Sequence, residues 1–385
     1  MKKTISILGS TGSIGLTSLK ILDKKKNYFK PLIFVANKNL NLINKQIRLY
    51  RPKYFIITDK KIYQKIKLKF KNKKTIVLNN LDQIYLKKKS DITISSIPGI
   101  NGLPFTFSMI KLSKKILIAN KEAIICGWNL IKKESEKYQT KIIPIDSEHY
   151  SISKLIEHHS LNEIKKIYIT ASGGPFLNYN LSKLKKIKPK EALRHPKWKM
   201  GKKISIDSST LMNKILELIE AQKIFNIPNN KIDMLIHPNS LVHAIIELKN
   251  GLSKFIYHET SMIIPIANAI FDGELNIDDF YERSQLKNFN DLRFRRVPKN
   301  IFKIVKIKNR VTEYPSTPII INAANETLVS QFLAKKITFL SISKTIIKLL
   351  NDLNYKKYAI KKPKNIKEII KIDQWTREHT KKLIS

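Results

Sequence analysis

The sequence predicts an α/β protein with an N-terminal doubly wound, Rossmann-like parallel sheet, a central α+β domain and a C-terminal helical domain. Short apolar runs alternate with helical stretches from residue 4 to about residue 145. Between residues 234 and 259 the pattern changes to strands joined by a Lys-Asn-Gly turn, and from residue 321 onward amphipathic helices follow one another. We therefore expect domains at 1–145, 146–280 and 313–385, with a charged, irregular linker at 281–312.

The composition fits a globular protein of two or three domains. At 385 residues, of which 42% are hydrophobic, the chain is too long for one ordinary core. Cys126 is the single cysteine, so a disulfide framework is excluded and a reducing compartment is expected. We find neither a secretory signal peptide before the first strand nor an apolar run long enough to span a membrane. The expected location is the cytoplasm.

The formal net charge of +43 would attract polyanions. The lysines are dispersed from Lys2 to Lys382 and are mixed with isoleucine and asparagine, rather than gathered in one arm. This pattern indicates a coding bias toward A and T more than a dedicated nucleic-acid surface. We expect anionic substrates to bind readily and no specific nucleic-acid partner.

A glycine loop follows the first predicted strand, Thr4–Leu8. Gly9 permits a tight turn, Gly12 lets the backbone approach a pyrophosphate, and Gly15 lets the following helix pack on the strand. The helix N-terminus then offers free N–H groups to phosphate. The spacing is GxxGxxG instead of the commoner GxGxxG, so an ordinary glycine-rich turn is the alternative.

The end of the second predicted strand favours NADP over NAD. Enzymes that use NAD usually place an acidic residue there to hold the ribose hydroxyls. This chain instead has Asn37, Lys38 and Asn39, which suit a 2′-phosphate better. The alternative is that Lys38 is simply a solvated lysine in a lysine-rich chain.

Two further strand ends carry polar residues. Asn120, Lys121 and Glu122 follow the strand KILIAN, at the edge where parallel sheets bind ligands. Asp146 and Glu148 follow the next apolar strand within PIDSEHYS, and in an extended segment this spacing points both carboxylates the same way. Such a pair could supply two of the oxygen ligands of a site for Mg²⁺ or Mn²⁺. The alternative is that a lone Asp-x-Glu sequence is more often a solvated turn.

The segment from Arg194 to Lys203 has the composition of a mobile lid over an anion. It combines proline, glycine and several cations with His195, Trp198 and Met200. Ordinary packing is the alternative for His195 and Trp198.

A predicted phosphate site surrounds this segment. Ser172 lies in a Ser-Gly-Gly turn after a strand, and Ser208, Asn213 and Lys214 lie around the start of a helix. Glu217, three residues beyond Lys214, is placed to be a third cation ligand, and Glu220 lies one turn further on. His237 and His243, in the small predicted sheet, are interpreted as structural or interfacial.

Taken together, these motifs make the chain resemble the 1-deoxy-D-xylulose 5-phosphate reductoisomerase family over nearly its whole length. The motifs that carry the resemblance are ILGSTGSIG (7–15), ANKE (119–122), PIDSEH (144–149), SGGPF (172–176), RHPKWKMGKKISIDSSTLMNK (194–214), LIHPNSLVHA (235–244) and NAANE (322–326). The resemblance implies a ketose phosphate substrate that is rearranged to a branched aldehyde and then reduced by NADPH to 2-C-methyl-D-erythritol 4-phosphate in the non-mevalonate route to isoprenoids. It also implies a divalent cation (Mg²⁺, Mn²⁺ or Co²⁺), a homodimer formed through the central catalytic domain, a flexible lid and a bacterial cytoplasmic setting.

The resemblance also implies roles for individual residues. Its nucleotide contacts fall on Thr11, Gly12, Ser13, Ile14, Lys38, Asn39, Asn120, Glu122 and Gly201. Its metal ligands fall on Asp146, Glu148 and Glu217. Its substrate contacts fall on Lys121, Ser147, Glu148, Ser172, His195, Ser208, Asn213 and Lys214, and we expect Glu217 to border the substrate too. The expected catalytic residues are Lys121, Glu148 and His195.

The chain departs from the family pattern at three places. Asn37 and Ile215 stand where glycine is usual, which puts the ribose-phosphate loop and the helix presenting Glu217 in question. Residues 292–317 have diverged. Two other classes remain as alternatives: a metal-independent NADP-dependent sugar-phosphate dehydrogenase, and a nucleic-acid-binding protein suggested by charge alone.

Overall fold

The computed structural model describes residues 2–71, 73–198, 200–282 and 292–384. The chain divides into two compact units. The first consists of Met1–Ala123, Asn129–Asp146 and Met262–Arg283, and the second of Ile124–Trp128, Ser147–Ser261 and Ser284–Ser385.

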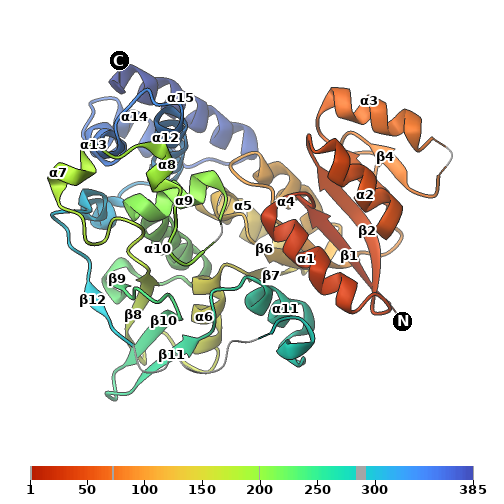
Figure 1. The fold of residues 1–385 in the computed structure, drawn as a ribbon, viewed down its shortest axis with the longest axis horizontal. Helices are drawn as coiled ribbons and strands as arrows, with labels where there is room; N and C mark the ends of the chain where they lie inside the picture. The colour runs from red at the N-terminus through yellow and green to blue at the C-terminus, as the bar shows by residue number, and fades with distance from the viewer. Residues whose placement is uncertain (1, 72, 199, 283–291, 385) are drawn as a thin grey trace. The chain divides into compact units, whose positions relative to one another are not determined.

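A seven-stranded sheet forms the core of the first unit (Figure 1). Its strands are β1 (Lys3–Leu8), β2 (Phe29–Ala36), β3 (Tyr54–Ile57), β4 (Ile76–Leu78), β5 (Ser90–Ser95), β6 (Ser113–Ile118) and β7 (Lys141–Pro144). They lie in the order β4-β3-β2-β1-β5-β6-β7, and every recorded pairing is parallel. The strand order reverses at β1, which confirms the predicted doubly wound sheet and puts the topological switch point, where such sheets bind ligands, at the end of β1.

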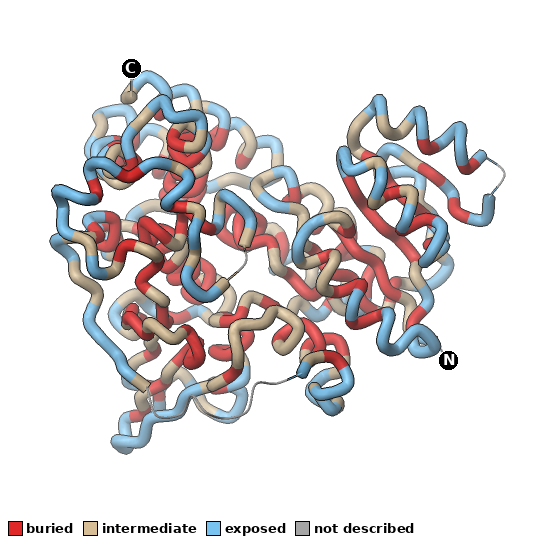
Figure 2. Tube along the Cα trace, in the orientation of Figure 1, coloured by how far each residue is buried: buried red, intermediate tan, exposed pale blue. Residues whose placement is uncertain are grey.

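Helices alternate with these strands, as the βα pattern predicts. They are α1 (Ser13–Lys24), α2 (Leu40–Tyr50), α3 (Lys60–Lys69), α4 (Gly102–Ile110) and α5 (Lys121–Tyr138). β1, β2, β3, β5 and β6 are buried over most of their length (Figure 2), because central parallel strands are covered on both faces, whereas the outer strands β4 and β7 are more exposed.

Residues 262–283 belong to the first unit, whereas the sequence pattern groups most of them with residues 146–280. Their helix α11 (Ile263–Phe271) packs on α1 and β6. Lys115 Nζ donates to Ala269 O at 3.0 Å, and Phe271 meets the ring of Phe29 at 5.8 Å between centroids. The ring contact and the bond from Lys115 to the end of α11 therefore hold this segment against the parallel sheet. The 3₁₀ helix η2 (Ile277–Asp279) follows α11.

The second unit is built on a five-stranded sheet in the order β11-β10-β8-β9-β12. The strands are β8 (Ile164–Ala171), β9 (Ile232–Ile236), β10 (Val242–Leu248), β11 (Ser253–Tyr257) and β12 (Arg295–Arg296). β10 is antiparallel to β8 and β11, while β8 and β9 are parallel. The predicted small sheet and its Lys-Asn-Gly turn are confirmed.

Helices make up the rest of the second unit. They are α6 (Ser147–Leu155), α7 (Leu181–Leu184), α8 (Pro189–Ala192), α9 (Lys202–Thr210), α10 (Met212–Phe225), η1 (Asn229–Lys231), α12 (Thr317–Leu333), α13 (Phe339–Leu350), α14 (Tyr355–Ala359) and α15 (Ile366–Ile384). The C-terminal helices appear as predicted. Among the described residues, no helix is both long and apolar enough to cross a membrane.

The predicted linker at 281–312 is more ordered than its charge suggests. The 3₁₀ helix η4 (Lys303–Arg310) lies inside it, and Ile304, Val305 and Ile307 are buried. Apolar residues recurring between the lysines explain this difference, since they give the segment one face that can pack. Residues 283–291 of the expected linker lie outside the described residues.

Candidate active site

Three carboxylates from two parts of the chain meet at one point. Asp146, Glu148 and Glu217 each offer an oxygen, and these oxygens lie within 4.8 Å of one another. Asp146 ends the segment Asn129–Asp146 of the first unit, and its peptide bond to Ser147 joins it to the second unit. The sequence predicts this grouping, and the donor set of oxygen ligands suits a hard divalent cation.

The expectation that PIDSEHYS is extended is wrong. Ser147 begins α6, so Glu148 lies in the first turn of a helix and Asp146 immediately precedes it. Acidic residues at this end of a helix interact favourably with its free N–H groups and dipole. The two carboxylates therefore converge through a helix start, and Glu217 joins them from the buried face of α10.

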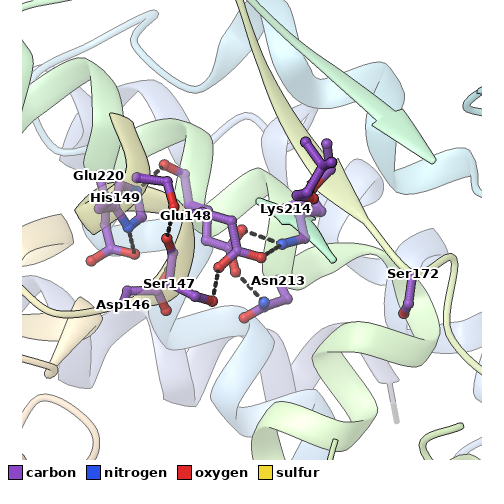
Figure 3. A network of polar contacts seen from close by, with 12 residues as sticks. Asp146, Ser147, Glu148, His149, Ser172, Asn213, Lys214 and Glu220 are labelled. Carbon is purple, nitrogen blue, oxygen red and sulfur yellow. Dashed lines mark hydrogen bonds and ion pairs between the residues drawn. The ribbon is translucent and has the colours of Figure 1, made fainter. Parts of the chain in front are cut away.

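Lys214 bridges two of these carboxylates (Figure 3). Its Nζ donates to Glu148 Oε1 and to Glu217 Oε2, the latter at 2.5 Å, and the side chain is buried. Burial by itself lowers the pKa of Lys214, but the charges of Glu148 and Glu217 outweigh it and raise the pKa overall. Lys214 is therefore a permanent ammonium group at the centre of the cluster.

The remaining contacts fix the carboxylates in place. Ser147 Oγ donates to Glu148 Oε2 at 2.6 Å, and Asn213 Nδ2 donates to Glu217 Oε1. Lys121, in the first turn of α5, has its Nζ 3.3 Å from Asp146 Oδ2. Each of the three carboxylates thus has a nitrogen or hydroxyl donor of its own.

Sequence reasoning missed one residue that joins this cluster. His149 is fully buried, and its Nε2 lies 2.8 Å from the backbone oxygen of Glu217. Its Nδ1 lies 3.9 Å from Glu220 Oε2, as Figure 3 shows. His149 therefore ties α6 to α10, the two helices that present Glu148 and Glu217. Its place next to Glu148, at the end of the motif PIDSEH, was the available signal.

His195 reaches the loop that follows β8. Its Nδ1 accepts the N–H groups of Lys197 and Trp198 at 3.2 and 2.9 Å, so Nε2 carries the proton and donates to Ser172 Oγ at 3.0 Å. Burial, and secondly the charge of Lys214, lower the pKa of His195 to about 4. The imidazole is neutral at physiological pH and presents a hydrogen-bond donor beside Ser172.

Ser208 lies near the end of α9, where the loop carrying Ser172 packs. Gly174 has φ +66°, and a Cβ there would lie 2.9 Å from the backbone oxygen of Ser208. Only glycine permits this approach. Leu211, with φ 62°, then connects α9 directly to α10 and its Asn213 and Lys214. The structure thus brings the predicted phosphate ligands onto a loop and two consecutive helices of one unit.

The glycine turn after β1 is shaped as a ligand loop. Gly9 and Ser10 donate their N–H groups to Val35 O, both at 2.9 Å, and a Cβ on Gly15 would lie only 2.3 Å from Gly9 O. Gly12 and Ser13 at the start of α1 are exposed, and no side chain caps this helix end. The start of α1 therefore has N–H groups that no side chain caps, next to the switch point of the sheet.

Two asparagines expected to contact the nucleotide also cap helices. Asn39 Oδ1 accepts from Leu42 N at 3.1 Å at the start of α2. Asn120 Oδ1 accepts from Ala123 N at the start of α5, and its Nδ2 donates to Ile97 O and Gly99 O. An asparagine directly before a helix is itself a capping signal, which the sequence interpretation did not use. Asn37 and Lys38 are exposed, Glu122 is buried, and Gly201 is an exposed N-cap of α9.

Family models and related proteins match the chain over nearly its whole length. Family models described as 1-deoxy-D-xylulose 5-phosphate reductoisomerase, its C-terminal domain and a DXP reductoisomerase C-terminal domain match residues 5–127, 142–225 and 258–379. The chain is 44% identical over 384 residues to the 1-deoxy-D-xylulose 5-phosphate reductoisomerase of Pelagibacter ubique, covering 97% of each chain. The Thermodesulfovibrio yellowstonii enzyme of the same name is 36% identical, with 100% of both chains covered.

The chain belongs to the 1-deoxy-D-xylulose 5-phosphate reductoisomerase family.

Solved structures support this membership of the reductoisomerase family. The Zymomonas mobilis reductoisomerase in complex with NADPH matches with a TM-score of 0.90 and 28% identity, covering 100% of both chains. A DOX-P reductoisomerase in complex with NADPH, fosmidomycin and magnesium matches with a TM-score of 0.91 and 30% identity, covering 99% of this chain and 98% of that one. The resemblance drawn from the sequence motifs is confirmed.

The departures from the reductoisomerase pattern can now be placed. Ile215 is fully buried within α10, and the contact between Asn213 and Glu217 forms beside it. Asn37 is exposed at the end of β2. The diverged residues 292–317 include the packed helix η4. None of the three departures separates the groups of the carboxylate cluster.

Proposed function

We propose that the chain converts 1-deoxy-D-xylulose 5-phosphate into 2-C-methyl-D-erythritol 4-phosphate, using NADPH and a divalent cation, in the non-mevalonate route to isoprenoids. The observation that carries the proposal is the cluster of Asp146, Glu148 and Glu217 with Lys214 between two of them. A plain dehydrogenase needs no such triad. Family membership and the ligands named for the related complexes support the same function.

The three carboxylates hold the cation. Mg²⁺, Mn²⁺ or Co²⁺ bound there supplies Lewis-acid polarisation of the ketose oxygens and a template for their orientation. The protein must therefore keep Asp146, Glu148 and Glu217 ionised and correctly aimed. Ser147, Asn213 and His149 do this through the contacts described above. Lys121 and Glu148 are the groups able to hold or move a proton next to these oxygens.

The phosphate of the substrate is held by Ser172, Ser208, Asn213, Lys214 and His195. The neutral His195 offers its Nε2–H beside Ser172, and Lys214 is near enough for its charge to lower the pKa of His195, so hydroxyl, amide, imidazole and charged donors are available to one anion. Binding energy from this remote phosphate positions the reacting end of the ketose. The segment from Arg194 to Lys203 acts as the lid, whose closure excludes water before hydride transfer.

NADPH binds at the turn after β1, with its pyrophosphate against the residues around the start of α1 (Thr11, Gly12, Ser13 and Ile14). Lys38, with Asn37 and Asn39, receives the 2′-phosphate at the end of β2. Asn120, Glu122 and Gly201 complete the nucleotide contacts.

Replacing Lys38 by Asp removes the positive charge and introduces a carboxylate suited to ribose hydroxyls. We expect the ratio of kcat/KM values for NADPH and NADH to shift toward NADH. An unchanged ratio would show that Lys38 does not contact the 2′-phosphate.

The protein acts as a homodimer in the bacterial cytoplasm. Support for the dimer comes from β11, an edge strand of the five-stranded sheet whose outer side has no recorded strand partner among the described residues. Phe255 on β11 is 45% exposed and Leu252 beside it is 60% exposed. The residues of the central region, 146–280, thus combine the catalytic groups with the dimer surface, while 313–385 form the helical domain.

The direct test supplies purified protein with 1-deoxy-D-xylulose 5-phosphate, NADPH and Mg²⁺. NADPH absorbance should fall, and mass spectrometry should identify the branched tetritol phosphate. A chelator should abolish turnover, and Mn²⁺ should restore it. Turnover of the ketose phosphate that persists in chelated buffer would contradict the metal centre, and consumption of NADPH without a rearranged product would favour a simple dehydrogenase.

A further inference from the structure

A buried carboxylate lies one residue before the predicted phosphate ligand Ser208. Asp207, on α9, has no exposed surface. Its Oδ1 accepts a hydrogen bond from Asn325 Nδ2 at 2.8 Å, and its Oδ2 lies 2.8 Å from Lys203 Nζ one turn earlier on the same helix. A carboxylate buried this deeply is unfavourable unless such partners compensate it. The pairing therefore fixes α9 at this point.

The partner Asn325 belongs to the C-terminal helices. It lies on α12 and is itself fully buried. The next residue, Glu326, accepts from Arg377 on α15, and Arg377 also donates from Nε to Asp373 Oδ2 at 2.6 Å. Polar contacts thus extend from α9 through α12 to α15.

The end of α9 controls the phosphate ligands. Ser208 follows Asp207 directly, and its backbone oxygen is the group against which Gly174 packs. Gly174 N in turn donates to Ser172 Oγ at 3.0 Å. A rotation or shift of α9 would therefore move Ser208 and the loop of Ser172 together.

The same shift would reach α10. Leu211 is the only residue between α9 and α10, and it is buried in a left-handed conformation. Such a connection has little freedom to absorb a displacement. Asn213 and Lys214, at the start of α10, would be displaced with the end of α9.

We propose that Asp207 and Asn325 are positioning residues for phosphate recognition. The pair anchors α9 on the C-terminal helices and so holds Ser208 and the Ser172–Gly174 loop at the phosphate of the substrate. This proposal rests on the proposed function. It assigns the C-terminal helical domain a part in substrate binding, although none of its residues is expected to touch the substrate.

The test compares a phosphorylated with an unphosphorylated substrate. Asn325→Ala leaves Asp207 Oδ1 without its donor, so kcat/KM for 1-deoxy-D-xylulose 5-phosphate should fall about tenfold. The kcat/KM for 1-deoxy-D-xylulose, which has no phosphate, and the Kd for NADPH should stay within about twofold of the wild type. A generally loosened fold would instead lower activity on both ketoses equally, and that result would overturn the proposal.

Two further variants complete the experiment. The exchange D207N/N325D restores a donor and an acceptor across the same contact, and it should recover most of the lost preference for the phosphorylated ketose. Tyr355→Phe is the matched control, because it removes a buried hydrogen bond of 2.6 Å to Thr317 in the same helical region without touching α9. It should lower the Tm without changing the ratio of the two kcat/KM values. An equal change of that ratio in Tyr355→Phe would contradict a role specific to Asp207 and Asn325.

Folding and function can be separated in these measurements. If Asn325→Ala does not fold, Asn325→Ser removes the same amide donor with a smaller loss of polarity, and an unchanged preference in that variant would overturn the proposal. If the wild type turns over neither ketose, the proposed function itself has failed. If the wild type prefers the phosphorylated ketose and the variants do so equally, only the positioning role has failed.

Discussion

At the scale of single residues, charge balance governs the active site. Three carboxylates close together repel one another. Lys214 and Lys121 offset part of this repulsion, Lys214 by bridging Glu148 and Glu217 and Lys121 by lying 3.3 Å from Asp146. Two ammonium groups therefore lie against the carboxylates and offset part of their negative charge.

Asp146 tests the metal centre directly. Asp146→Asn removes one anionic ligand but keeps the size of the side chain, so turnover should fall on the order of a hundredfold or more. Titration calorimetry should show weaker Mn²⁺ binding and an unchanged Kd for NADPH. Asp272→Asn is the control, because it also breaks a carboxylate–lysine pair of the first unit, the 2.8 Å contact with Lys115. Equal Mn²⁺ affinity in the two variants would argue against Asp146 as a ligand.

His258 gives the stability of the protein a pH dependence. Burial lowers the pKa of His258 from 6.5 to about 4, outweighing a hydrogen bond to the backbone of Glu259. The unfolded chain therefore binds a proton as the pH falls through 6.5, whereas the folded protein does not until about pH 4. This contribution to stability is complete above pH 6.5 and is lost progressively below it.

The expected effect is measurable by urea unfolding at about pH 7.5 and about pH 5. The loss of unfolding free energy between these conditions should be smaller in His258→Gln by about 2 kcal/mol. An equal loss in both proteins would show that His258 is protonated in the folded state.

At the scale of secondary structure, the turn from β1 to α1 leaves no space for a side chain at Gly15. Gly15→Ala would place a Cβ 2.3 Å from Gly9 O, so the turn must deform. We expect a lower Tm and a loss of NADPH affinity, by fluorescence titration. At Gly201, which starts α9 with a φ of −64°, an added Cβ would have no atom within 4 Å, so Gly201→Ala should fold like the wild type.

The two glycine variants separate folding from binding. If Gly201 contacts the nucleotide as the family resemblance implies, Gly201→Ala should bind NADPH several-fold more weakly at an unchanged Tm, an effect on the order of 1 kcal/mol. An unchanged Kd for NADPH would remove Gly201 from the nucleotide site.

The sequence predicts those elements that its local pattern determines. The glycine turn and the alternating strands and helices follow from spacing and residue type, and the grouping of Glu217 with Asp146 and Glu148 was expected from residue type together with the family resemblance. Contacts between distant segments could not be foreseen in this way. The return of α11 to the first sheet depends on Phe29 and Lys115, and the burial of Asp207 depends on Asn325, which is 118 positions away. The helix start at Ser147 was missed because DxE spacing suits either an extended segment or a capped helix.

At the scale of the whole molecule, the edge strand β11 bears on assembly. Phe255→Lys introduces a charge on an exposed position, so the fold of a single chain should be unaffected. Sedimentation velocity should show a dimer for the wild type and a monomer for Phe255→Lys, because burying an unpaired ammonium group in an interface is strongly unfavourable. Leu353→Lys is the control, since Leu353 is 97% exposed on a turn of the helical region. A dimeric Phe255→Lys would place the interface elsewhere.

The glycines of the chain carry a record of mutational drift. Only 11 glycines occur in 385 residues, against an average usage of about 7% in globular proteins. Six of these glycines have positive φ, and at Gly15 and Gly102 a Cβ would lie within 2.4 Å of another atom. A genome drifting toward A and T replaces glycine codons wherever selection allows. Most of the remaining glycines therefore mark positions where the backbone resists replacement, Gly201 being an exception, and in other genomes with the same bias the remaining glycine codons should be enriched at the tight turns of the encoded proteins.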